Sequence, residues 1–278
     1  MAKKYSVELE QKIVDCYNQG ITPYQMVYMI PELYGKRPSV IYDVLKRLGI
    51  KSHNPTPLTE EQKKKRRKYN VNDDYFETID IEEKAYWLGF LYADGFVTTI
   101  ENKIGISLSN IDKNHLYKFK DCVDSQSPIK DYVQTEGYNA GSTYSRIIIT
   151  SEKMKKDLLS KGVLENKTNI LTFPSYNQVP KSLIRHFIRG YIDGDGSLTH
   201  SSVSNLIKIT GTKEILLGIQ KELGTNVTLE QRYPERNVNN YSITIGGNIQ
   251  VKRILNFLYG NSTIYLERKY KRYEEICN

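Results

Sequence analysis

The sequence predicts an α+β protein with a small all-α unit at the amino terminus and two copies of an αββαββα unit after it. Three short amphipathic segments occupy the first 50 residues. A nine-residue motif then occurs twice, 101 residues apart, and similar helix and strand patterns follow each copy. The 278 residues are enough for about two folding units of ordinary size, each with its own core.

The amino-terminal unit, residues 1–50, is expected to hold three helices. Apolar residues recur at helical spacing over Ser6–Asn18, and Gly20 follows as a C-terminal cap. The second segment, Thr22–Ile30, begins with a cap residue followed by proline. The third, Pro38–Leu48, ends at Gly49.

This unit resembles a trihelical helix-turn-helix domain, with Pro38–Leu48 as its recognition helix. The resemblance implies DNA contact by residues on the exposed side of that helix. The alternative is a plain three-helix bundle that uses its charges for solubility. The candidate DNA-binding residues are Arg37, Ser39, Tyr42 and Arg47.

Residues 51–78 are interpreted as a basic linker because they combine Pro55 and Pro57 with a dense cationic run. Such a run can contact phosphates or can simply be solvated. The candidate phosphate-binding residues are Lys63, Lys64, Lys65, Arg66 and Arg67.

The repeated motif reads WLGFLYADG over Trp87–Gly95 and IRGYIDGDG over Ile188–Gly196. The two copies align without gaps. Each is followed by strand, helix, strand, strand and helix patterns, and each half closes with a similar string, Leu-Glu-Asn-Lys or Leu-Glu-Arg-Lys. We therefore divide the rest of the chain into a first repeat, 79–180, and a second, 181–278.

Small residues four apart in each copy, such as Gly89 and Ala93, would let two motif helices approach closely. Gly95 and Gly196 are expected to end these helices through glycine's permissive backbone. Asp94 and Asp195 would then lie side by side at two negative helix ends, where a divalent cation would neutralise them. The alternative is that each Asp-Gly pair only forms a turn at the end of its helix. Its occurrence at the same position in both copies favours the metal site instead.

The two segments resemble the LAGLIDADG motif of homing endonucleases, and the resemblance covers roughly residues 79–273. It implies two motif helices packed at a pseudo-twofold axis and antiparallel saddle sheets that form one long DNA-binding groove. It also implies a monomeric site-specific endonuclease that cuts double-stranded DNA with Mg²⁺, for which Mn²⁺ can substitute. Asp94 and Asp195 would be the catalytic metal ligands.

The same resemblance places Lys167 and Lys269 at the family's basic position near the active site; surface solvation is the alternative for both. The family's earlier acidic position is Tyr92 in one copy and Asp193 in the other, so we assign a catalytic role to neither. Tyr92 is expected to pack or to form a hydrogen bond.

Strand alternation predicts which side chains face DNA, because alternate residues share one face of a sheet. Polar residues that can contact bases or phosphates then occupy one face of each sheet. An ordinary exposed polar face is the alternative. The candidates are Lys103, Ser107, Tyr144 and Arg146 in the first repeat, and Lys208, Thr210, Arg232 and Thr244 in the second.

Composition agrees with a nucleic-acid partner. The net charge is +8, no run of about 18 apolar residues predicts a membrane helix, and the three cysteines form no zinc spacing. We expect a cytoplasmic protein, nucleoid-associated if it is bacterial or phage-encoded. The alternative function is an RNA maturase that binds an intron, or a non-catalytic DNA-binding regulator with a LAGLIDADG fold.

Overall fold

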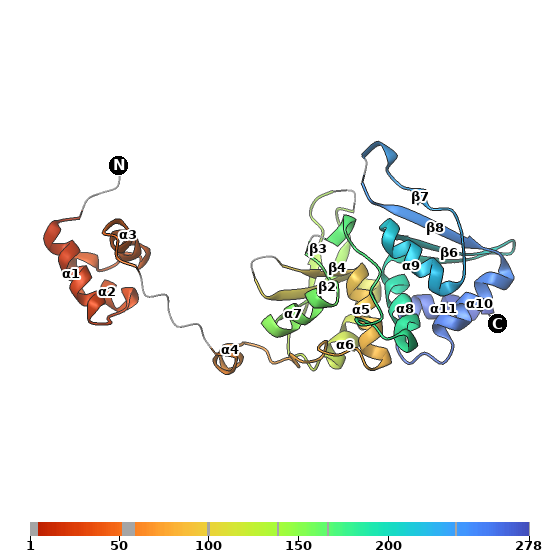
Figure 1. The fold of residues 1–278 in the computed structure, drawn as a ribbon, viewed down its shortest axis with the longest axis horizontal. Coiled ribbons are helices and arrows are strands. Elements are labelled where there is room, and N and C mark those ends of the chain that lie inside the picture. Colours follow the sequence, from red (N-terminus) through yellow and green to blue (C-terminus); the bar gives the residue numbers. More distant parts are fainter. Residues whose placement is uncertain are drawn as a thin grey trace. The chain divides into compact units, whose positions relative to one another are not determined.

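The computed structural model describes residues 5–51, 59–98, 101–137, 139–165, 167–236 and 238–277. The chain divides into two compact units, Met1–Arg66 and Arg67–Asn278 (Figure 1). Of the predicted linker candidates, the Lys63 side chain lies outside the described part. None of the described helices is long and apolar enough to cross a lipid bilayer.

The first unit contains the three predicted helices, α1 (Val7–Asn18), α2 (Pro23–Met29) and α3 (Ser39–Arg47), with a short 3₁₀ turn, Pro31–Leu33, before α3. Local chemistry sets their ends. The Ser6 hydroxyl accepts from the Leu9 N–H, and Thr22 and Gln25 form a capping box. One small core, which includes Ile13, Met26 and Ile41, holds the helices together.

The predicted linker is not a uniform segment. Its basic run forms a helix, α4 (Glu60–Arg66), because Thr59 and Gln62 cap its first turn through reciprocal hydrogen bonds of 3.1 and 3.2 Å. Beyond it, Tyr75 and Phe76 are buried in the core of the larger unit. Residues 67–78 therefore belong structurally to that unit rather than to a linker.

The larger unit contains the predicted αββαββα order twice, with strands that pair antiparallel as β1-β2-β4-β3 and β5-β6-β8-β7. An additional helix, α11 (Glu267–Cys277), follows the second repeat. The first repeat comprises α5 (Glu82–Ala93), β1 (Gly95–Val97), β2 (Lys103–Ser109), α6 (Lys113–Cys122), β3 (Ile129–Val133), β4 (Thr143–Thr150) and α7 (Glu152–Ser160). The second comprises α8 (Ile184–Asp195), β5 (Gly196–His200), β6 (Asn205–Gly211), α9 (Lys213–Leu223), β7 (Glu230–Gln231), β8 (Tyr241–Gly246) and α10 (Asn248–Tyr259).

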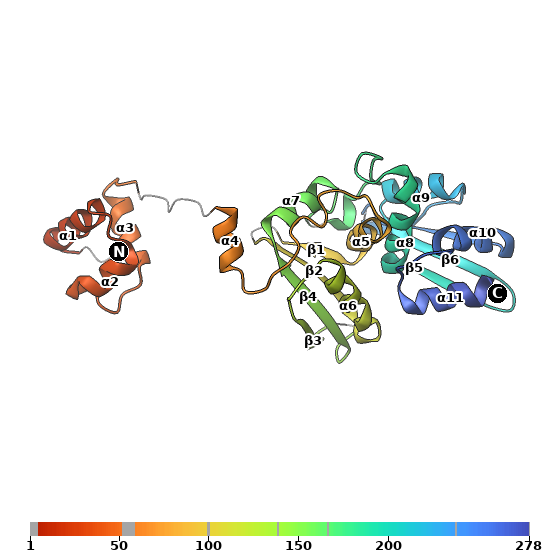
Figure 2. The same ribbon diagram turned by 90° about the horizontal axis from the view of Figure 1, so that it is seen from below.

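The alternation of the strands matches the prediction. Ile104, Ile106 and Ile147 are completely buried on one face, against which α6 and α7 pack (Figure 2). In the second repeat Ile207 and Ile209 are buried in the same way, under α9 and α10. The opposite faces carry the polar residues of β2, β4, β6 and β8.

Candidate active site at the two motif helices

The two motif helices, α5 and α8, lie side by side at the centre of the larger unit (Figures 1 and 2). Their backbones touch where the glycines stand. A Cβ atom added to Gly89 would lie 2.0 Å from the Phe187 carbonyl oxygen, and one added to Gly190 would lie 2.0 Å from that of Tyr86. The predicted close approach is confirmed, and only glycine permits it at these two positions.

Gly95 and Gly196 act differently from the prediction. Neither has a positive φ; the φ of Gly196, for example, is −104°. Each begins a strand directly after the helix, and an added Cβ would lie 2.7 Å from the Leu91 carbonyl oxygen or 2.6 Å from that of Ile192. These glycines are required because the strand folds back closely over the last helical turn.

The two motif aspartates occupy equivalent helix ends. Asp94 is the C-cap of α5 and Asp195 is the last residue of α8. A Cβ added to Gly194 would lie 3.4 Å from the Asp94 Oδ2 atom, so the Asp94 carboxylate lies against the last turn of α8. Burial raises the pKa of both carboxyls, and the neighbouring Asp94 charge helps to raise that of Asp195 to about 6.

Lys269 is buried and Lys167 is half-buried, so neither side chain is simply solvated. The Lys167 ammonium donates to the carbonyls of Leu91 and Ala93, both at 2.6 Å, at the end of α5. The Lys269 ammonium donates to Ile192, Asp193 and Gly196, at 2.6 to 2.7 Å, at the end of α8. Each lysine therefore satisfies the orphan carbonyls of one motif helix.

Burial lowers the pKa of both lysines to about 8, and the charges of Asp94 and Asp195 oppose this shift. Because each ammonium also lowers the pKa of both carboxyls, the four side chains form one electrostatic group. We call Asp94, Asp195, Lys167 and Lys269 the charged tetrad.

Asp193 is a polar residue next to the tetrad that sequence reasoning left without a role. Its buried carboxylate accepts hydrogen bonds from the Tyr86 and Tyr259 hydroxyls and from the Leu266 N–H, at 2.6 to 2.8 Å. Leu266 directly precedes the helix that carries Lys269, so Asp193 fixes that helix to α8. Tyr92, which holds the position of Asp193 in the first motif, donates to the Lys161 carbonyl, so the expected hydrogen bond is present.

The four candidate residues of the first sheet lie on one face, and their side chains make different contacts. Arg146 donates through Nε to the Ser107 hydroxyl at 2.7 Å, and Tyr144 stacks on Tyr132 with ring centroids 5.3 Å apart. Lys103 is partly neutralised because it pairs with Glu101 at 2.5 Å.

The candidate residues on the polar face of the second sheet have different surroundings. Lys208 is exposed, and in the strand register it lies between Ser197 and Thr244. Thr210 is half-buried, and Arg232 lies just beyond β7, close to the ring of Tyr233 at 5.4 Å. The polar faces of the two sheets are therefore not copies of one another.

Two of the basic candidates in the first unit and linker are engaged elsewhere. Arg47 pairs with Glu10 of α1 and so ties α3 to α1. Arg67 makes a bidentate pair with the buried Asp73, at 2.8 and 3.1 Å, and its side chain is only 15% exposed. Arg67 is therefore a structural residue of the larger unit, not an available phosphate contact.

The remaining candidates of this region are exposed. Arg37, Ser39 and Tyr42 lie at or near the start of α3 with open side chains. On α4, Lys65 pairs with Glu61 at 2.8 Å but remains 74% exposed, and Lys64 and Arg66 are also exposed.

In a comparison with known protein families, residues 182–258 match the family of LAGLIDADG-like domains. A 136-residue stretch, 49% of this chain, is 30% identical to the DNA-directed RNA polymerase subunit Rpo1C of Methanocaldococcus jannaschii. The chain spans only 15% of the length of that protein.

Several solved structures have a distantly similar arrangement. The meganuclease I-SmaMI bound to uncleaveable DNA matches with a TM-score of 0.45 and 14% identity, over 72% of this chain and 88% of that chain. The LAGLIDADG homing endonuclease I-LtrWI bound to target DNA matches with a TM-score of 0.44 and 12% identity, over 74% and 90%.

The family match covers α8 and most of the second repeat. The first repeat shares its motif, its order of elements and its strand order. The second repeat therefore contains a LAGLIDADG-like domain, and the first repeat has the same motif and the same order of elements.

Proposed function

We propose that this protein is a site-specific endonuclease of the homing type, which hydrolyses phosphodiester bonds in double-stranded DNA at a long pseudosymmetric target. The observation that carries the proposal is the charged tetrad. Two carboxylates lie at adjacent ends of two packed helices, and a lysine that donates to the helix carbonyls accompanies each end. Because both repeats lie in one chain, we expect a monomer to cut both strands.

The carboxylates and the lysines of the tetrad have different electrostatic roles. Burial makes each carboxylate costly to ionise alone, and the two lysines lower that cost. Each ammonium, held by two or three carbonyls, keeps a fixed position near the place where a phosphate would bind. It can attract that phosphate and stabilise negative charge that develops on it.

The donor set suits a hard divalent cation. Asp94 and Asp195 supply carboxylate oxygens, and no cluster of three or more His, Cys, Asp or Glu ligands occurs among the described residues. Mg²⁺ is satisfied by one or two carboxylates when water and substrate phosphate complete its shell, and Mn²⁺ is expected to replace it. When bound, such a metal would supply an activated water and stabilise the leaving oxygen.

The experiment that tests the proposal is selection of cleaved sequences from a duplex DNA library with a randomised centre. Parallel arms contain Mg²⁺, Mn²⁺, Ca²⁺ or a chelator. We expect one enriched site, cut on both strands in Mg²⁺ and Mn²⁺ and intact in the chelator. Sequence-specific binding without cleavage in any arm would instead favour a non-catalytic regulator, and the absence of DNA binding would contradict the proposal entirely.

A further inference from the structure

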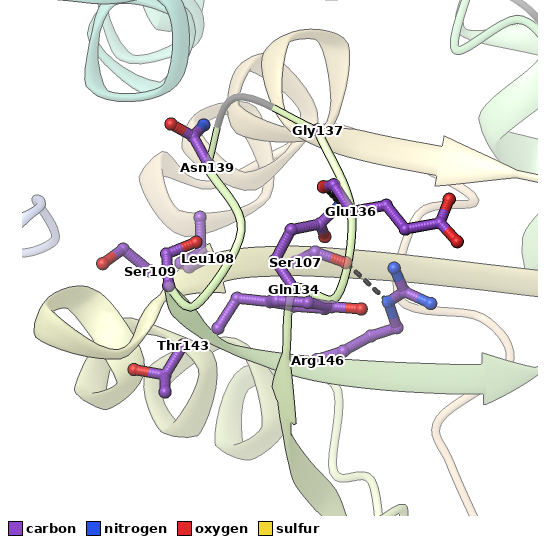
Figure 3. A pocket seen from close by; sticks show the side chains of 11 residues that line it. Ser107, Leu108, Ser109, Gln134, Glu136, Gly137, Asn139, Thr143 and Arg146 are labelled. Atoms are coloured by element: carbon purple, nitrogen blue, oxygen red, sulfur yellow. Dashed lines mark hydrogen bonds between the residues drawn. The ribbon is translucent and has the colours of Figure 1, made fainter.

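A hollow of about 660 Å³ lies on the polar face of the first sheet, beneath the loop that joins β3 to β4 (Figure 3). Ser107 and Arg146 form its floor, and Gln134 and Glu136 line it from the loop. The register places Ser107 directly opposite Arg146 on neighbouring strands.

The Arg146 side chain is held in one orientation. Its Nε donates to the Ser107 hydroxyl at 2.7 Å, and its guanidinium lies 5.3 to 5.6 Å from the ring centroids of Phe96, Tyr132 and Tyr144. Gly105 permits this arrangement, since a Cβ there would lie 2.3 Å from the Phe96 ring. An arginine fixed in this way loses little side-chain entropy when it binds a ligand.

The free edge of the guanidinium is available to a ligand. Because Nε is occupied by Ser107, the two terminal nitrogens remain for a ligand, and the side chain lines the hollow (Figure 3). Among the described residues no carboxylate forms an ion pair with Arg146. The side chain thus presents a planar, two-nitrogen fork on the proposed DNA-binding face.

The geometry points to Arg146 as a specificity-determining residue that reads one guanine in the half-site bound by the first repeat. An arginine fork matches the O6 and N7 acceptors of guanine in the major groove. Glu136 favours a base over a phosphate at this place, because an acidic side chain repels phosphate but can accept a hydrogen bond from the N4 amino group of the paired cytosine. This inference rests on the proposed DNA-binding function.

The second repeat lacks an equivalent fork. In the row that corresponds to Ser107 and Arg146, β6 carries Lys208 and β8 carries Thr244. A lysine ammonium can also contact guanine, but it lies on a flexible stem and lacks the rigid planar fork of Arg146, so it fixes the contact less strictly. The structure therefore assigns the stricter guanine preference to the half-site of the first repeat.

The test is selection of bound duplexes from a randomised DNA library in Ca²⁺, with the wild-type chain, Arg146→Ala, Arg146→Lys and Ser107→Ala. For the wild type we expect one position at which guanine is preferred by about 10- to 100-fold. Arg146→Ala should reduce that preference to within about threefold and Arg146→Lys should reduce it by a smaller factor, while the rest of the site is retained. Ser107→Ala should weaken it less, and the second-repeat control Lys208→Ala should leave it unchanged.

Two outcomes would overturn the inference while leaving the proposed function intact. One is a selected site without a strictly preferred guanine. The other is an Arg146→Ala variant that keeps the guanine preference but binds all sequences more weakly, with a smaller salt dependence. That result would show that Arg146 contacts a phosphate. Failure of the wild-type chain to select any sequence would contradict this inference and the proposed function together.

Discussion

At the scale of single residues, the central feature is that charges of both signs meet at one place, where Lys269 is buried, Asp94 and Lys167 are half-buried and Asp195 is exposed. Burial disfavours every member of the charged tetrad, and the attraction between lysines and carboxylates only partly compensates. An arrangement that is unfavourable for the free protein is typical of a site prepared for a ligand, which under the proposed function is a phosphate with its cation.

The first prediction concerns Asp195 and the stability of the metal-free protein. Because the folded-state pKa of Asp195, about 6, exceeds the ordinary value of 3.8, the folded state holds this proton more tightly than the unfolded state. Stability therefore falls as pH rises between these values. Because Asp195 is exposed, solvent screening reduces the effect: in a chelator, Asp195→Asn should raise the free energy of unfolding by about 1 kcal/mol at pH 7 and much less at pH 4.

Urea denaturation at the two pH values measures this difference. The exposed Asp121→Asn change on α6 is the matched control and should have no comparable pH-dependent effect. Equal stabilisation by Asp195→Asn at both pH values would contradict a raised pKa of this carboxyl and its repulsion by Asp94.

The second prediction concerns the two lysines. Their folded-state pKa values are lowered to about 8, so their ammonium charges are lost as pH rises through that value. If these charges stabilise the reacting phosphate, cleavage at saturating Mg²⁺ should fall by roughly tenfold between pH 7.5 and 9.5. A cleavage rate that stays constant or rises over this range, while DNA binding is retained, would exclude the lysines from the chemistry.

At the scale of elements, the contact between α5 and α8 determines the geometry of the tetrad. The two helices meet through Gly89 and Gly190, and Arg189, the neighbour of Gly190 in α8, forms an ion pair of 2.7 Å with Glu82 at the start of α5. Arg189 is completely buried and also donates to the carbonyls of Leu258 and Ile264. The glycine contact and this ion pair hold α5 against α8, which keeps Asp94 and Asp195 adjacent.

The third prediction follows from this contact. Gly190→Ala should destabilise the larger unit by about 3 kcal/mol or more, because the new methyl group would overlap the Tyr86 carbonyl and force the helices apart. Gly246→Ala is the control: its Cβ would meet only the Leu206 side chain, at 3.2 Å, and should change stability by about 1 kcal/mol or less. Similar unfolding midpoints for the two variants would show that the backbones are not in close contact.

Periodicity and cap residues predicted the three helices of the first unit to within one residue at each end, because those signals are local. The repeat predicted the doubled αββαββα order and the adjacent aspartates. The partners of Lys167 and Lys269 could not be predicted, since they are backbone carbonyls more than 70 residues away. The helix at Glu60–Arg66 could have been predicted, because Thr59 and Gln62 have capping-box spacing.

The ion pairs formed by Arg47 and Arg67 also could not be predicted from the sequence. In sequence each is one cation among several, and only tertiary contact reveals that Glu10 or Asp73 neutralises it. The role of Gly95 was misread for a related reason. An Asp-Gly pair suggests a turn with positive φ, whereas the tight return of β1 over α5 is what excludes a Cβ.

At the scale of the whole molecule, the two compact units suggest a division of labour. The tetrad and both polar sheet faces belong to the larger unit, which has its own extensive core. The first unit, with its exposed Arg37, Ser39 and Tyr42, is proposed to extend DNA contact as a helix-turn-helix domain.

The fourth prediction is that a fragment beginning at Arg67, which retains the pair with Asp73, still folds and cleaves the selected site. We expect its footprint on DNA to be shorter and its affinity to be lower by about tenfold or more, because phosphate contacts from α3 and α4 are absent. Footprinting and cleavage of the selected site compare the fragment with the full chain. Loss of all cleavage by a folded fragment would refute this division of labour.

The central claim is that Asp94 and Asp195 together form the catalytic centre, and strand-specific cleavage by their asparagine variants tests it most directly. The substitution removes a charged metal ligand and nearly preserves shape, so binding of the selected duplex in Ca²⁺ should stay near wild type. In Mg²⁺ we expect each single variant and the double variant Asp94→Asn/Asp195→Asn to lose double-strand cleavage by about a thousandfold or more. A double variant that cuts both strands at the wild-type rate would contradict the account.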